Sequence, residues 1–321
     1  MRLLFITHPY PNYVPDLLLH GLRKLLGDRV VDYPRKDCLY EGFLGTGVAD
    51  ESQLLKNWFP EDTGVDRTDI PTKILSGYFK YIIVDLRAAQ SFYSVYGGKT
   101  IAATVVIIDG EDSPQRIPPG NYIVCQRETD GSDYSIPMPM ALPQEVFELI
   151  TSFDNPEKSY SIGFLGSVSD LCDERLVLLE QLAKRYPDAL LKATAVPSNN
   201  DPLPKGRLGK LDYYASLQRC RFVLSLKGAG YDTFRFWENS ACKAVHLSQR
   251  MPLYIPNDFI DGKDILRFSD IDELVRKIEA VLEGQVSEGE MIATCRERLC
   301  RYHLTDKRAE YLLRKLKALT G

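Results

Sequence analysis

Several residues between positions 221 and 238 have the types and spacing needed to bind a phosphate group. Residues 221–226 are apolar enough to predict a strand, which runs into a glycine turn at Gly228 and Gly230. A short helix follows and carries Arg235. Such a turn leaves backbone N–H groups and the positive end of the helix facing one point. A guanidinium group also suits phosphate oxygens, so we predict an anion site here.

Glu238 adds a carboxylate to this site. It lies three residues after Arg235 and therefore on the same helix face. There it could accept hydrogen bonds from ribose hydroxyls, as acidic residues do in dinucleotide-binding folds. The alternative is a surface ion pair between the two side chains, worth only about 0.3 kcal/mol. We favour a nucleotide-diphosphate pocket, because the glycine turn, the strand end and the helix start coincide.

Two neighbours of the turn are further candidates. Lys227 could contact phosphate, or could simply be solvated. Tyr231 could stack on a base or a sugar ring, or pack within its own loop. Gly166 ends an earlier expected strand in the same half of the chain. The predicted set of ligand-binding residues is Gly166, Lys227, Gly228, Gly230, Tyr231, Arg235 and Glu238.

Candidates for proton transfer lie in the first half of the chain. Glu111 and Asp112 follow a buried strand and could supply the base that removes a proton from a hydroxyl group, or could form a turn with a helix cap. His8 ends the first strand and could act as a base near neutral pH, or could be structural. The Asp-x-Asp pattern at residues 270–272 begins a helix, and capping explains it. We therefore expect no metal site.

Composition restricts the class of protein. A length of 321 residues suggests two domains. A formal net charge of −4 disfavours a wide electrostatic surface for nucleic acid. No apolar run approaches the ~20 residues of a membrane span, and the first strand is too short for a signal-peptide core. Seven scattered cysteines without a Cys-x-x-Cys motif favour a reducing compartment. We expect a cytoplasmic protein.

Strand patterns alternate with helix patterns along the whole chain. Strands are expected at residues 3–7, 30–33, 81–86, 104–109, 122–125, 161–165, 190–194, 221–226 and 244–247. Helices are expected from a cap at Asp16 to Gly27, at residues 144–153, 173–186 and 212–220, from a cap at Asp270 to Gly284, and at residues 290–319. Strands separated by helices imply parallel sheets with right-handed crossovers.

The chain divides into two α/β halves. Residues 136–143 are too rich in proline for a regular helix or a central strand and form the best linker, together with the residues up to 158. Two such halves predict an α/β fold of two Rossmann-like domains that face a cleft. Ligands in such folds bind outside the carboxyl ends of the strands. The glycine turn, Gly166 and the loop after Thr7 all lie at such ends.

Residues 213–282 resemble the nucleotide-sugar half of glycosyltransferases with the two-Rossmann (GT-B) architecture. The order is a small helix, an apolar strand, the glycine turn, Arg235, Glu238, a helix of small residues, a strand and an acid-capped helix. The pattern looks most like exostosin-like and spore-maturation-type members of glycosyltransferase group 1. Two residues depart from it: Lys243 replaces a glycine, at a cost of about 1 kcal/mol if the turn is left-handed, and His246 replaces a proline. His246 could reach the pocket.

Shorter segments extend the resemblance. Residues 161–166 followed by Arg175 resemble the first strand and turn of the same half. Residues 109–112, 126–128 and 137–141 look like the acceptor half of the spore-maturation group. The resemblance implies an acceptor domain at residues 1–150, a donor domain at 151–295, and a final segment, 296–321, that returns to the first domain.

The resemblance also implies an activity. Arg235 would hold the diphosphate and Glu238 the ribose of a nucleotide-sugar donor. His8, Glu111 or Asp112 would activate the hydroxyl of an acceptor, which could be a glycan, a small molecule, a protein or a modified base. We expect a metal-independent hexosyltransferase that needs no cofactor beyond the donor.

Two alternatives remain open. One is a non-catalytic protein of similar fold that binds a nucleotide or sugar phosphate. The other is a glucosyltransferase that modifies nucleic acid and binds it through a basic groove in the first half. The basic residues concerned, for which a solvated helix face is the favoured interpretation, are Arg23, Lys24, Arg29, Arg35 and Lys36.

Overall fold

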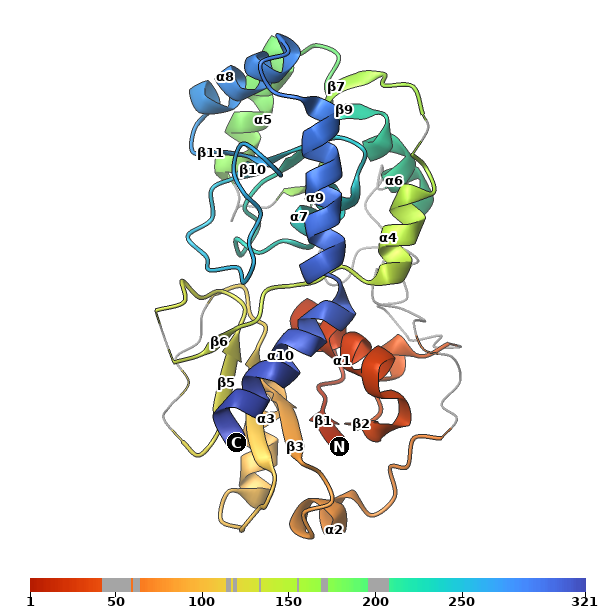
Figure 1. Ribbon diagram of the computed structural model, residues 1–321, viewed down its shortest axis with the longest axis vertical. Helices are drawn as coiled ribbons and strands as arrows, with labels where there is room; N and C mark the ends of the chain where they lie inside the picture. The colour runs from red at the N-terminus through yellow and green to blue at the C-terminus, as the bar shows by residue number, and fades with distance from the viewer. Residues whose placement is uncertain are drawn as a thin grey trace.

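The computed structural model shows two α/β units stacked end to end along the long axis of the molecule (Figure 1). The structure describes residues 1–41, 59, 64–113, 117, 120–132, 134–154, 156–168, 173–195 and 208–321. One unit contains a six-stranded sheet and the other a five-stranded sheet. Every pairing between the described strands is parallel. The predicted α/β fold of two Rossmann-like domains is confirmed.

The six-stranded sheet has the strand order β2-β1-β3-β4-β5-β6. Its strands are β1 (Leu3–Ile6), β2 (Val30–Tyr33), β3 (Tyr81–Asp85), β4 (Thr104–Asp109), β5 (Ile123–Gln126) and β6 (Ile136–Pro137). Its helical elements are α1 (Tyr13–Leu26), η1 (Gly27–Arg29), η2 (Asp37–Leu39), α2 (Ile70–Leu75) and α3 (Leu86–Tyr96). The central strands are apolar because helices cover both faces of a parallel sheet. Pro137 lies in the edge strand, where its missing N–H is tolerated.

The five-stranded sheet has the order β11-β10-β9-β7-β8. Its strands are β7 (Tyr160–Val168), β8 (Leu190–Ala195), β9 (Cys220–Ser225), β10 (Val245–Gln249) and β11 (Leu266–Phe268). Its helices are α5 (Asp173–Arg185), α6 (Lys210–Gln218), α7 (Phe234–Ala241), α8 (Ile271–Leu282) and α9 (Glu288–Tyr302), and α4 (Gln144–Thr151) precedes it. Asp270 caps α8 by accepting a hydrogen bond from the Glu273 N–H at 2.8 Å, as predicted.

The start of α1 differs from the prediction. Asn12, not Asp16, caps this helix, and its side chain accepts a hydrogen bond from the Val14 N–H. Asp16 instead accepts a hydrogen bond from the Asn12 N–H at 2.9 Å, which gives a reciprocal arrangement like that of a capping box. The predicted end at Gly27 is confirmed, with φ of 60° there. The sequence signal was ambiguous because Asn and Asp both favour the cap position.

The end of the chain returns to the first unit. The segment predicted to be mostly helical, residues 290–319, forms two helices, α9 and α10 (Thr305–Thr320). In Figure 1, α9 runs along the upper unit and α10 lies across the lower one, where it packs on α1. The domain boundary predicted at residue 150 falls within α4, and the division into three segments stays a prediction. In the described part of the chain, no helix is long and apolar enough to cross a bilayer.

Gly21 allows the close contact between α1 and α10. A Cβ atom at this position would overlap the Thr305 carbonyl group, which is backbone and cannot rotate away. We expect Gly21→Ala to lower the free energy of unfolding by about 1–3 kcal/mol, because the two helices must move apart. Gly289, in α9, is the matched control, because a Cβ there would meet nothing within 4 Å. Chemical denaturation of both variants measures the difference, and an equally stable Gly21→Ala variant would contradict the expectation.

Candidate functional site

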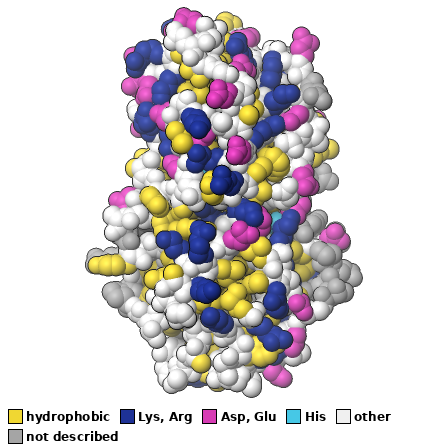
Figure 2. Space-filling model, in the orientation of Figure 1, with side chains coloured by type: hydrophobic (Ala, Val, Ile, Leu, Met, Phe, Trp, Pro, Cys, Tyr) yellow, Lys and Arg dark blue, Asp and Glu magenta, His cyan; other side chains and the backbone are white. Residues whose placement is uncertain are grey.

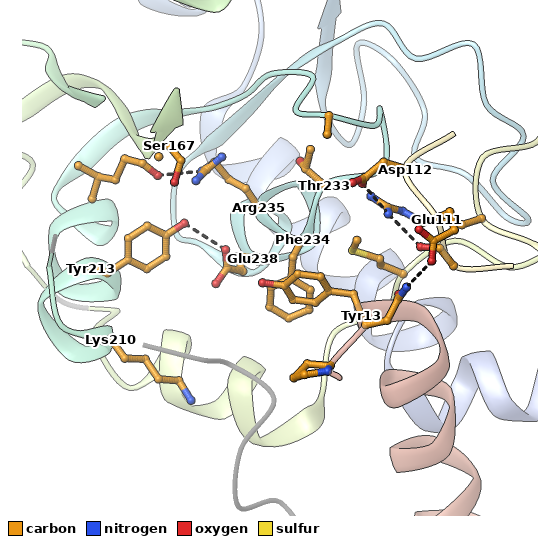
Figure 3. A pocket seen from close by; sticks show the side chains of 18 of the residues that line it. Tyr13, Glu111, Asp112, Ser167, Lys210, Tyr213, Thr233, Phe234, Arg235 and Glu238 are labelled. Atoms are coloured by element: carbon orange, nitrogen blue, oxygen red, sulfur yellow. Dashed lines mark hydrogen bonds and ion pairs between the residues drawn. The ribbon is translucent and has the colours of Figure 1, made fainter. Parts of the chain in front are cut away.

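A cavity of about 680 Å³ lies between the two sheets, at the carboxyl ends of their strands (Figure 3). Its volume is typical of a site for a small ligand. The upper unit contributes residues from β7, β8, α6 and α7, and the lower unit contributes the turn after β4, Arg127 and the start of α1. The lining side chains used below are Asn12, Tyr13, Glu111, Asp112, Arg127, Lys192, Lys210, Tyr213, Phe234, Arg235 and Glu238.

Arg235 lies at the base of the upper wall. Its Nε donates a hydrogen bond to the Leu165 carbonyl at 2.9 Å, and its guanidinium group lies 4.9 Å from the Phe164 ring centroid. It also lies directly over Gly166, where a Cβ would be 2.5 Å from Nη2. Within the described residues, the Nη1 and Nη2 groups of Arg235 have no protein acceptor. The first turn of α7 therefore presents a positioned guanidinium group to the cavity.

Glu238 lies one helical turn further along α7 and is 3% exposed. One carboxylate oxygen accepts a hydrogen bond from the Tyr213 hydroxyl at 3.0 Å (Figure 3). The other accepts one from the Tyr214 hydroxyl at 2.7 Å. Burial raises the pKa of Glu238. Arg235 and Glu238 make separate contacts rather than the surface ion pair considered as the alternative. Both line the cavity.

Two lysines complete a cationic upper wall. Lys192 lies in β8 and Lys210 begins α6. Burial lowers the pKa of Lys210, and the nearby carboxylate of Glu238 raises it. The sequence reasoning missed both lysines, because neither belongs to a turn or a motif that marks a ligand site.

The lower wall is acidic. Glu111 and Asp112 follow β4, as predicted, and both line the cavity. The Asp109 side chain accepts a hydrogen bond from the Glu111 N–H at 3.1 Å, so the same residues also form the turn considered as the alternative. Glu111 accepts a hydrogen bond from the Asn12 side chain at 3.3 Å. Asp112 instead forms an ion pair with Arg127 at 2.8 Å.

Arg127 and Asp232 join the two units behind this wall. Arg127 is 6% exposed, and it donates hydrogen bonds to the Asp112 carboxylate and to the Asp232 carbonyl. Asp232 is fully buried, and its carboxylate accepts hydrogen bonds from the Met140 N–H at 2.7 Å and the Trp237 indole at 2.8 Å. The sequence reasoning did not identify this pair, whose members are 105 positions apart.

Four of the predicted residues around the glycine turn do not line the cavity. The Gly228 N–H donates a hydrogen bond to the Gly230 carbonyl at 2.9 Å, so the turn closes on itself. The Lys227 ammonium group lies 4.6 Å from the centroid of the Tyr231 ring. Only Ala229 of this turn reaches the cavity. The role of Lys227, Gly228, Gly230 and Tyr231 as ligand-binding residues stays a prediction.

His8 also lies outside the cavity lining. Its Nδ1 accepts a hydrogen bond from the Tyr10 N–H at 3.3 Å, and its ring stacks on that of Tyr10 with 5.8 Å between centroids. Burial, and then the charge of Arg87, lower the pKa of His8. The structure thus places the two carboxylates at the cavity and the histidine beside it.

The two departures from the glycosyltransferase pattern have structural explanations. Helix α7 ends at Cys242 in an extended conformation, with φ of −68° and ψ of 150°. Lys243 is not left-handed, so the expected strain is absent at this position. His246 is 1% exposed and contacts the hydroxyls of Ser225 and Ser240 at 2.8 and 3.1 Å. Burial lowers its pKa to about 3, so it is a neutral core residue. The expectation that it could reach the pocket is wrong.

The two parallel α/β units and the cavity between their strand ends define a protein of the GT-B fold class. Residues 175–314 match a family described as glycosyl transferase-like. A glycosyltransferase from Rickettsia africae has the same fold, with a TM-score of 0.59, 11% identity, and 100% of this chain and 99% of that one covered. No curated protein matches the chain in sequence. The predicted exostosin-like or spore-maturation subtype stays a prediction.

HepE from Anabaena has the same fold and was solved with UDP, with UDP-glucose, and with UDP and glucose. Its complex with UDP gives a TM-score of 0.56 and 11% identity over 99% of this chain and 100% of HepE. Its complex with UDP and glucose gives 0.57 and 12% identity over 99% of both chains. At these identities the likeness shows the fold alone.

Proposed function

We propose that this protein transfers a sugar from a nucleoside-diphosphate donor to the hydroxyl group of an acceptor. One observation carries the proposal: a single cavity has a cationic wall on one unit and an acidic wall on the other. A departing diphosphate needs the first, and a hydroxyl nucleophile needs the second. The match to a glycosyl transferase-like family and the UDP complexes of HepE support it.

The upper wall would bind the donor. The Nη groups of Arg235 would donate hydrogen bonds to the diphosphate, with Lys192 and Lys210 as further positive charges. Glu238 would accept hydrogen bonds from the ribose hydroxyls through the lone pairs that its two tyrosine partners leave unused. Negative charge grows on the diphosphate as its bond to the sugar breaks, so these cations would stabilise the transition state more than the ground state.

The lower wall would activate the acceptor. In an inverting reaction, a base takes the hydroxyl proton as the acceptor oxygen forms a bond to the anomeric carbon and the diphosphate leaves with its electron pair. We assign this role to Glu111, because Asp112 is held by its ion pair with Arg127. We further propose that cationic side chains of the protein neutralise the charge of the diphosphate without a metal ion. Measuring turnover in the presence of excess chelator would test this proposal.

A thermal-shift panel of UDP, GDP, ADP and their sugar conjugates tests the donor assignment. Binding to the folded state alone raises the melting temperature. HepE makes UDP and UDP-glucose the first probes. If no nucleotide in the panel stabilises the protein, the proposal fails. Stabilisation without hydrolysis or transfer would instead favour the non-catalytic binding protein.

Glu111→Gln should lower kcat by about 100-fold, because an amide cannot accept the proton. The amide keeps the size of the side chain, and its oxygen can still accept the Asn12 hydrogen bond. Donor affinity should therefore stay unchanged. Steady-state kinetics with the donor that the thermal-shift panel identifies measure kcat. Asp112→Asn is the matched variant at the neighbouring carboxylate. A larger loss in Asp112→Asn would transfer the role of base to that residue.

Gly166→Ala should weaken nucleotide binding about tenfold, because the new methyl group would force Arg235 out of its position. The end of a flexible side chain can move, so the fold should remain intact. Gly98→Ala is the control, since a Cβ there would meet nothing within 4 Å. Calorimetric titration with UDP measures the effect. Equal affinity in the two variants would show that Arg235 does not bind the nucleotide where it now lies.

A further inference from the structure

We infer that the acceptor is an uncharged carbohydrate rather than a phosphorylated or nucleic-acid substrate. The inference rests on the proposed function and extends it to the class of acceptor. It comes from three features: the charge of the lower wall, the aromatic surface between the two walls, and the partners of the basic residues in the lower unit.

Among the described residues that line the lower wall, no cation is available to pair with an anionic acceptor. Arg127, the one cation among the described residues that line this wall, is bound to Asp112 and Asp232 and is 6% exposed. Behind the wall, Arg87 forms an ion pair with Asp85 at 2.6 Å and reaches Glu111 only at 4.0 Å. A phosphate group brought beside Glu111 and Asp112 would be repelled. Neutral hydroxyl groups would instead find carboxylate acceptors.

An aromatic surface lies between the two walls. Tyr13 stacks on Phe234, the first residue of α7, with 5.1 Å between ring centroids and 19° between planes. In Figure 3 this pair lies between Arg235 and Glu238 on one side and Glu111 and Asp112 on the other. An aromatic ring with a polar end suits a sugar ring, which has an apolar C–H face and a rim of hydroxyls. Tyr13 therefore offers a stacking surface beside the base.

The basic residues once considered for nucleic acid each have a partner within the protein, and Lys24, Arg29 and Arg35 are also exposed to solvent. Lys36 is 1% exposed and pairs with Asp16 at 3.0 Å. The remaining partners are Asp32 for Arg23, Glu145 for Lys24, the Leu26 carbonyl for Arg29 and Asp37 for Arg35. Figure 2 shows further Lys and Arg side chains along α10 on the outer face, and α10 does not line the cavity. None of these five residues lines the cavity, so they form no basic groove there.

A binding panel tests the inference on the full-length protein. The panel holds neutral oligosaccharides, the phosphate esters of the same sugars and a single-stranded oligonucleotide. Binding is measured with the donor site occupied by UDP, or by whichever nucleoside diphosphate stabilises the protein most. We expect neutral sugars to bind at least about tenfold more tightly than their phosphate esters, because like charges oppose the esters.

Variants locate the neutral site. Tyr13→Ala should weaken binding of the preferred neutral sugar about tenfold through the lost stacking surface, and Tyr13→Phe should retain most of it. Tyr10→Ala is the control, because Tyr10 is an exposed tyrosine of the same segment that does not line the cavity. Nucleotide affinity should stay unchanged in all three.

The two proposals fail in distinguishable ways. If no nucleotide binds, the proposed function fails, and the acceptor inference fails with it. If the nucleotide binds but the protein prefers phosphate esters or the oligonucleotide, or binds no neutral sugar, only the acceptor inference is overturned. Equal sugar binding by Tyr13→Ala and Tyr10→Ala would also overturn it.

Discussion

Arg235→Ala is expected to weaken nucleotide binding about 10- to 100-fold, because charge-assisted hydrogen bonds contribute about 1.5–3 kcal/mol. It should also lower kcat by about 100- to 1000-fold, because this side chain would face the charge that develops on the diphosphate. Calorimetry with UDP and steady-state kinetics separate the two effects. Arg235→Lys should recover part of the binding but less of the rate, since an ammonium group lacks the planar pair of donors.

Two controls belong with this prediction. Arg235 also covers the Phe164 ring, so the melting temperature of the variant shows whether packing is lost. Arg185→Ala is the matched arginine variant: Arg185 is exposed on α5, pairs with Glu279 at 2.6 Å and lies outside the cavity. It should leave binding and rate unchanged. Unchanged nucleotide affinity and turnover in Arg235→Ala would refute the donor site.

Asp232→Ala is expected to lower the free energy of unfolding by about 3–5 kcal/mol, the cost of breaking a buried ion pair from one side. Asp232 is fully buried beside Arg127, whose Nε lies 3.6 Å from its carboxylate. Its removal would also leave the Met140 N–H and the Trp237 indole without their acceptor. Because Asp232 belongs to the upper unit and Arg127 to the lower one, the substitution should weaken the contact between the two units.

Urea denaturation measures this effect. Asp232→Asn should lose less stability than the alanine variant, because an amide oxygen can still accept one of the two hydrogen bonds. Asp130→Ala is the surface control: Asp130 is exposed and accepts hydrogen bonds from its neighbour Ser132, so the change should lie within about 0.5 kcal/mol. A midpoint for Asp232→Ala equal to that of the surface control would show that the buried network contributes no stability.

The sequence predicted the fold where local signals are strong. Strand β4, for example, was placed at its observed bounds, because buried parallel strands are nearly continuous apolar runs. Helices α2 and α3 and strand β11 were missed. In α3 only Ala89 and Phe92 are buried, and β11 has three residues, too few for a periodic pattern.

The same limit applies to the site. Arg235 and Glu238 were predicted as site residues because a strand end, a turn and a helix start occur within a short stretch, and both line the cavity. The geometry of the glycine turn could not be predicted from sequence, because the Gly228–Gly230 hydrogen bond depends on backbone angles that glycine leaves undetermined. The lysines of the upper wall were missed for another reason: a single lysine carries no local signal.

By itself, the sequence determined the order of strands and helices and the residues that end them, because these depend on neighbours a few positions apart. Only the tertiary structure decided which side chains share the cavity. Tyr13 meets Phe234, and Arg127 meets Asp232, across more than 100 positions of chain. Such contacts follow from how two sheets face each other, and burial then sets the charge and partners of each group. That arrangement made Glu238 and Glu111 members of opposite walls and left His246 a neutral residue of the core.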